Sequence, residues 1–165
     1  MRTPREALIK QLQRQHDGEP WHGPSREAVL EGITASMAAW RPAKDAHSIW
    51  ALVLHMRSWT REVMRRLEGN VPGEPADGDW PKVPAKADEA AWQATLASLQ
   101  ASHEELIAFV KTLSEDQLSE RVKARPGEQQ GIPNRAMLYS LAEHDIYHTG
   151  QVAMLKRLAA GARSS

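Results

Sequence analysis

Two histidines spaced one helical turn apart, His144 and His148, place the strongest constraint on how this chain can fold. On an α-helix, residues i and i+4 share a face, and Gln151 falls on that face too. The remaining positions of the face are apolar: Met137, Leu141 and Leu155. Two imidazole rings therefore occupy positions where leucine would be usual, and burying them unpartnered costs about 2–7 kcal/mol. A divalent metal ion would satisfy both rings, and hydrogen bonds to neighbouring helices are the alternative.

A third histidine, His55, lies in a similar setting on another predicted helix. It sits at the edge of an apolar stripe, flanked by Leu52 and Trp59. A ligand at the rim of a core suits an open metal site, because the ion must also reach solvent or substrate. Three neutral imidazoles and a water form such a site. We therefore hypothesise that His55, His144 and His148 bind zinc or nickel, with iron, cobalt or manganese as alternatives.

The residues around the pair on the last helix suggest supporting roles. Gln151 can orient a ligating ring or a bound water, or it can be a core-edge amide bonded to backbone. Tyr147 can lie over the mouth of the site, although packing alone would also explain it. Asp145 lies ~100° round the helix from His144 and should face a neighbouring helix. A metalloprotease would have glutamate where this chain has Asp145, which disfavours that class.

Composition narrows the classes of protein further. The 21 basic residues balance the 21 acidic ones, which argues against a nucleic-acid or anionic-membrane surface. There is no cysteine, and we see no apolar run of ~18–20 residues and no signal-peptide core. We expect a cytoplasmic protein of one domain over residues 1–165.

Helical periodicity without strand-like alternation predicts an all-α fold. We expect long helices over about 4–16, 46–68, 89–112 and 134–160, the last capped by Asn134 and ended by Gly161. Short helices are predicted over 26–32 and 35–40, and a short turn begins at Ser114. The proline-rich segment 70–86 should be a long loop ordered in part by Trp80. These elements predict a four-helix bundle with short extra helices in its long connections.

The other histidines show no metal-ligand pattern. We expect His103 at the surface or the rim, His16 at the end of the first helix and His22 in a loop. We expect His47 to begin the second long helix, with a supporting role at the metal as the less favoured reading.

The sequence resembles the DinB/YfiT-like family over nearly its whole length. The resemblance rests on AHSIWALVLHM (46–56) paired with HDIYHTGQ (144–151), and on WHGPS (21–25) and AAWRP (38–42). It implies a four-helix bundle that is often dimeric, with a divalent ion on His55, His144 and His148. It also implies thiol-dependent chemistry, in which the metal binds a low-molecular-weight thiol such as bacillithiol, mycothiol or glutathione as thiolate.

The leading functional hypothesis is thus a metal-dependent S-transferase that joins a low-molecular-weight thiol to a small electrophile, with no nucleic-acid or membrane partner. A metal-dependent hydrolase is one alternative, but the sequence offers no clear general base. The other is a non-catalytic, dimeric stress-response protein with a structural metal, which would normally need a fourth protein ligand.

Overall fold

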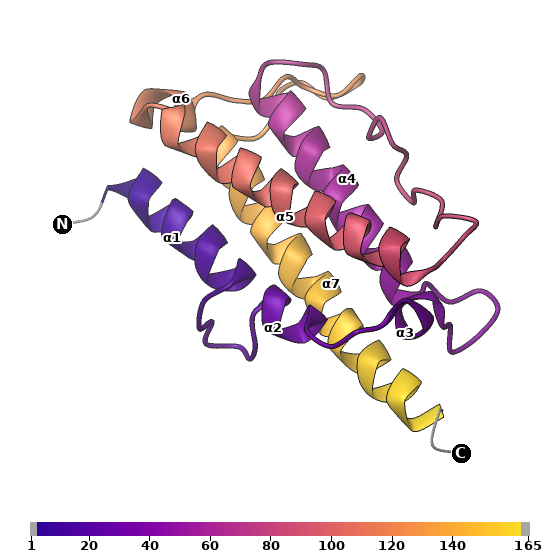
Figure 1. Cartoon of the computed structure of the whole chain (residues 1–165). Helices are drawn as coiled ribbons and strands as arrows, with labels where there is room; N and C mark the ends of the chain where they lie inside the picture. The colour runs from indigo at the N-terminus through magenta and orange to yellow at the C-terminus, as the bar shows by residue number, and fades with distance from the viewer. Residues whose placement is uncertain (1–2, 163–165) are drawn as a thin grey trace.

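The computed structural model describes residues 3–162, and helices are its regular elements (Figure 1). Within that range, the only β-type pairing is an isolated bridge between Arg121 and Pro133. In chain order the helices are α1 (Pro4–His16), α2 (Arg26–Leu30), α3 (Ala35–Ala39), α4 (Ile49–Leu67), α5 (Glu89–Thr112), α6 (Glu115–Ser119) and α7 (Asn134–Ala162). The all-α prediction is confirmed.

Four of these helices form the predicted bundle. Helix α4 packs against both α5 and α7, and α1 packs against the same two helices from the other side. The pairs α1/α4 and α5/α7 are therefore the diagonals. Helices α2 and α3 lie in the connection from α1 to α4 and contact α7, whose C-terminal end extends beyond the other long helices (Figure 1).

Most helices begin at a side chain that accepts a backbone N–H, as the predicted capping residues require. These N-caps are Thr3, Ser25, Thr34, Ser48, Asp88 and Ser114. Ser48 accepts from the amide of Ala51 at 3.2 Å, so α4 begins at Ile49 and not near Ala46 as predicted. His47 consequently precedes the helix.

Helix α7 begins at residue 134 as predicted, but Asn134 is the first residue of the helix and not its cap. Its side-chain amide donates to the carbonyl of Gln117 at 2.8 Å. Its Oδ1 accepts no hydrogen bond, so the side chain joins α7 to the end of α6 instead of capping α7. Gly161 is also helical, since α7 continues to Ala162.

The buried apolar residues form two clusters, one toward each end of the bundle. One cluster surrounds Trp50 and Trp92, and the other joins Leu8, Val110 and Leu138. In the region between the two clusters, each long helix contributes buried polar side chains: His16, His55, Ser58, Ser102, His103, His148 and Thr149. A polar layer therefore crosses the middle of the core, and its buried polar groups need hydrogen-bond or metal partners.

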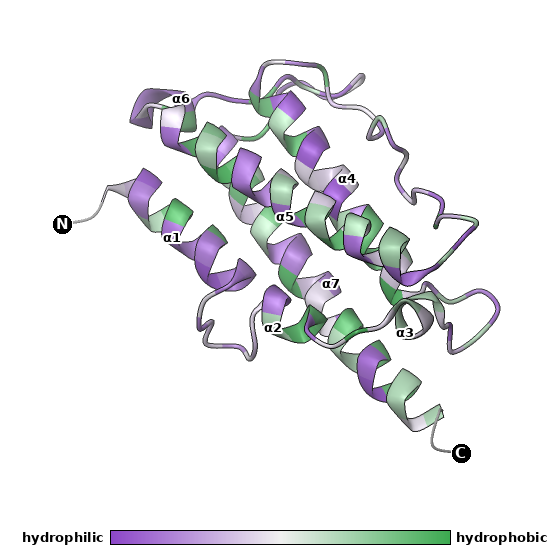
Figure 2. Cartoon of the chain, viewed as in Figure 1, coloured by the Kyte–Doolittle hydropathy of each residue, from purple (hydrophilic) through white to green (hydrophobic). Residues whose placement is uncertain are grey.

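Hydrophilic residues interrupt the hydrophobic ones along each long helix (Figure 2). None of the helices within residues 3–162 combines the length and apolar composition needed to cross a bilayer.

Candidate metal centre

The three histidines singled out in the sequence meet in the polar layer. Helix α4 carries His55 and α7 carries His144 and His148, and these two helices pack side by side. One ring nitrogen of each histidine lies within 4.8 Å of the others. The Nε2 atoms of His55 and His144 are 3.0 Å apart. Nitrogen ligands on one tetrahedral ion stand about 3.3 Å apart, so small side-chain shifts would bring the three into coordination range.

Hydrogen bonds fix the protonation of two of the rings. His55 donates from Nδ1 to the backbone carbonyl of Asp79 at 2.6 Å. His148 donates from Nδ1 to Oε1 of Gln151, also at 2.6 Å. Carbonyl oxygens only accept, so each Nδ1 carries the proton and each neutral ring has a bare Nε2. This is the donor set that a divalent ion needs, and these residues fit one.

Burial keeps the same two rings neutral. Desolvation lowers the pKa of His148 to about 4, with Gln151 opposing and His144 adding to the shift. Desolvation also lowers the pKa of His55, although its hydrogen bond to Asp79 opposes that shift. Only neutral imidazole binds a metal, so at neutral pH both rings are ready to do so without first losing a proton.

The segment between α4 and α5 covers His55. The indole of Trp80 stacks on the His55 ring with centroids 4.0 Å apart and also stacks on His47 at 3.5 Å. Helix α4 holds this segment through Ser58, which donates to the Gly78 carbonyl, and through Trp59, which donates to Asp79 Oδ1. Sequence reasoning identified Trp80 as an ordering residue but missed the Asp79 carbonyl, since a backbone contact has no signature in the sequence.

The other residues predicted near the metal take different positions. Gln151 contacts His148 directly. Tyr147 is 64% exposed, with its ring edge-on to that of His148 at 4.9 Å. Asp145 faces α2 as expected, where Arg26 donates to it at 2.6 Å. Burial alone would raise the pKa of Asp145, but the charge of Arg26 together with the nearby His144 and His103 outweighs it and holds that pKa below its usual value.

Sequence reasoning missed a second cluster on the other side of α7. His103, expected at the surface, is only 7% exposed and stacks on His16 with centroids 3.9 Å apart. His16 in turn accepts from Arg26, which is also buried. The prediction for His103 was wrong because α1 packs on that face of α5 and covers His103 with His16, a packing that helical periodicity does not reveal.

Within residues 3–162, no carboxylate or further histidine joins the three-histidine group. His22 is exposed, and His47 is occupied by its stack on Trp80. An ion held by these three nitrogens would keep a coordination position open, which is the arrangement of catalytic and not of structural sites.

Comparisons with known proteins agree with this fold. The chain resembles a crystal structure of a DinB-like protein from Bacillus subtilis, with a TM-score of 0.64 and 19% identity over 93% of this chain and 92% of that one. It also resembles a conserved protein from Enterococcus faecalis, with a TM-score of 0.70 and 20% identity over 98% of this chain and 99% of the other. A comparison with curated proteins gives no match. The family model described as the DinB superfamily matches residues 26–152. The chain therefore belongs to the DinB superfamily.

Proposed function

We propose that this protein binds one divalent metal ion through His55, His144 and His148, and uses it to transfer a low-molecular-weight thiol to a small electrophile. The main support for the metal site is that His55 and His148 each have an unprotonated Nε2. In both rings, Nδ1 donates its proton in a hydrogen bond. Zinc and nickel suit an all-imidazole donor set, and iron, cobalt and manganese are the alternatives.

The open position and the lack of a nearby base favour thiol chemistry over hydrolysis. A metal ion in this site would supply Lewis acidity, lowering the pKa of a bound thiol toward neutrality. Hydrolysis would also call for a general base at the site. Asp145, the carboxylate next to His144 in sequence, is ion-paired with Arg26 through Oδ2. The resemblance to thiol-dependent members of the family also favours thiol chemistry over hydrolysis.

Metal analysis of protein prepared without a histidine tag tests the site. We expect about one metal per chain in the wild type and loss of that metal in His55→Ala and His148→Ala. His22→Ala is the matched control, because His22 is exposed and stands outside the group. A folded wild type that neither contains metal nor takes up added Zn²⁺ or Ni²⁺ would refute the proposal.

A thiol-dependent assay tests the reaction. With 1-chloro-2,4-dinitrobenzene as the electrophile, a carbon–sulfur bond forms, chloride leaves and the thiol proton passes to solvent. We expect the rate to require both the metal and a thiol such as glutathione, and to fall to background in His148→Ala. Ester cleavage without any thiol would instead support the hydrolase. A metal-loaded protein inactive with every thiol tested would support a binding protein.

A further inference from the structure

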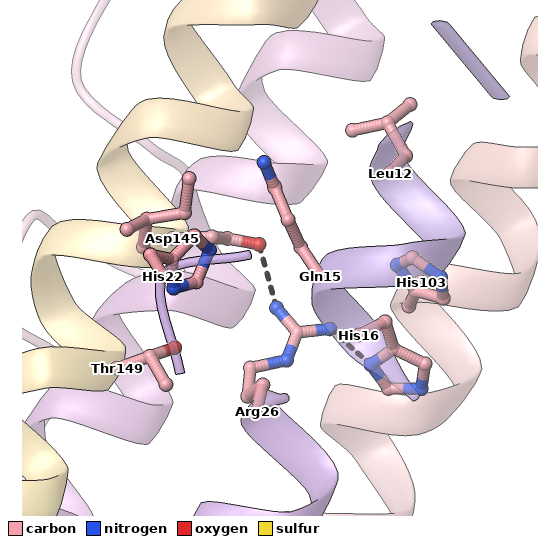
Figure 3. A pocket seen from close by; sticks show the side chains of 9 residues that line it. Leu12, Gln15, His16, His22, Arg26, His103, Asp145 and Thr149 are labelled. Carbon is pink, nitrogen blue, oxygen red and sulfur yellow. Dashed lines mark hydrogen bonds and ion pairs between the residues drawn. The ribbon is translucent and has the colours of Figure 1, made fainter. Parts of the chain in front are cut away.

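The buried ion pair between Arg26 and Asp145 lies directly behind the candidate metal centre. Arg26, the first residue of α2, is 3% exposed and donates from Nη1 to Asp145 Oδ2 at 2.6 Å (Figure 3). Its Nη2 donates to Nδ1 of His16 at 2.7 Å, and His16 donates from Nε2 to Gln100. A chain of hydrogen bonds from α5 through α1 and α2 thus ends at one carboxylate on α7. A buried ion pair is a poor source of stability, so its presence calls for another role.

The second oxygen of Asp145 has no partner. Asp145 Oδ1 is buried without a hydrogen bond, and so is Nδ1 of His144. These two atoms are 3.7 Å apart, too far for a hydrogen bond but close enough for a small side-chain rotation to make one. Buried polar atoms are rarely left unsatisfied, and two of them facing each other form a potential donor–acceptor pair.

The protonation of His144 explains why the pair is open. His55 carries its proton on Nδ1, so its bare Nε2 must accept the 3.0 Å hydrogen bond from Nε2 of His144. A neutral His144 then has its proton on Nε2 and a bare Nδ1, which cannot donate to Asp145. If a metal ion occupied Nε2, the proton of the neutral ring would be on Nδ1, which lies 3.7 Å from Asp145 Oδ1.

We propose that Asp145, held in place by Arg26, is a positioning residue that orients His144 and favours its metal-binding tautomer. This inference rests on the proposed metal site. Carboxylate–histidine–metal arrangements of this kind are common around protein metal ions. In this role Arg26 holds one oxygen of Asp145 and leaves the other beside His144.

Metal affinity of Asp145→Asn tests the proposal. An asparagine cannot present an acceptor to both Arg26 and His144 while keeping its amide group away from both donors. We expect Zn²⁺ to bind roughly 10–100-fold more weakly, measured by competition with a chromogenic chelator. The matched control is Glu143→Gln, which removes one exposed carboxylate on the other side of His144 in sequence. Unchanged affinity in a folded Asp145→Asn protein would overturn the inference.

A direct readout separates positioning from general damage. In the zinc-loaded wild type, the Nδ1 proton of His144 should give a protected, downfield NMR signal, and Asp145→Asn should lose it while the signals of His55 and His148 remain. Persistence of the His144 signal would overturn the proposal.

A double variant provides for the case in which Asp145→Asn does not fold because Arg26 is left as an unpaired buried charge. Arg26→Gln/Asp145→Asn removes both charges and should show the same loss of affinity and of the His144 signal. Wild-type affinity in the double variant would overturn the inference. If wild-type protein bound no metal at all, the proposed function would fail first, and the two failures are therefore distinct.

Discussion

The indole of Trp80 lies parallel to the imidazole of His55, with ring centroids 4.0 Å apart and planes inclined by 11°. The Asp79 carbonyl, one residue earlier, accepts the Nδ1 proton of the same imidazole. Two consecutive residues of one loop therefore control His55 in different ways: the backbone of one sets its tautomer, and the ring of the other limits its contact with solvent.

Removing the Trp80 ring should change the rate of metal exchange more than the affinity. In Trp80→Ala the Asp79 carbonyl still orients His55, but the stacked cover is gone, so we expect faster zinc removal by a chelator with a similar equilibrium constant. Stopped-flow measurements would check this. Trp21→Ala is the control, since Trp21 is 96% exposed. Equal removal rates in the Trp80 variant and the wild type would show that the ring is no barrier.

Gln151 should matter through the tautomer of His148. Gln151→Leu removes the acceptor of the Nδ1 proton, so the ring can place its proton on Nε2, where it blocks the metal. We expect roughly 10–100-fold weaker zinc binding by calorimetry. Gln151→Glu keeps an acceptor and should keep the affinity. Gln13→Leu, an exposed change on α1, controls for loss of a surface amide. Wild-type affinity in Gln151→Leu would contradict this role.

His103 should make the metal-free protein sensitive to acid. Burial, followed by the neighbouring His16 and Arg26, lowers the pKa of His103 to about 3 from its ordinary 6.5. Between these values the unfolded chain binds a proton that the folded protein does not, so the free energy of unfolding falls as pH falls. The contribution is at most about 1.4 kcal/mol per pH unit below 6.5.

Urea denaturation at pH 7, 6 and 5 would measure this slope. His103→Phe keeps a ring to stack on His16 but cannot titrate, so its stability should depend less on pH than that of the wild type. His22→Ala should retain the wild-type slope because His22 is exposed. If His103→Phe and the wild type had the same slope, His103 would not be the source of acid sensitivity.

Lys156 should anchor α2, and with it Arg26. Its Nζ donates to the carbonyls of Val29 and Glu31 at the C-terminal end of α2, at 2.9 and 2.6 Å. Lys156→Met should lower the free energy of unfolding by about 1–2 kcal/mol, since solvent at this end weakens the charged hydrogen bonds. Arg157→Met, an exposed change one residue later, is the matched control for thermal and urea unfolding. If both variants lost the same free energy of unfolding, the loss of a positive charge would be responsible, and not the hydrogen bonds of Lys156 to α2.

Periodicity and capping chemistry were enough to predict most of the helices. Thr34, Asp88 and Ser114 each cap a helix that the sequence predicts, because a side-chain oxygen before an apolar-periodic run satisfies local backbone amides. Asn134 failed as a cap because its side chain serves a tertiary contact with Gln117, seventeen residues away. Local rules predict local hydrogen bonds, and they fail where a distant segment competes for the same atoms.

The sequence by itself predicted the all-α bundle and the three candidate histidines. The spacing of His144 and His148 places them on one helix face, and His55 lies at the edge of an apolar stripe on another helix. Only the tertiary structure decided how these rings are protonated and what stands behind them. The Asp79 carbonyl, the Trp80 cover and the buried Arg26–Asp145 pair come from segments remote from the rings they affect. Hydrogen bonds and burial depend on which residues are close in space. The packing of α1, α2, α4 and α7 decides this, and no local sequence pattern contains it.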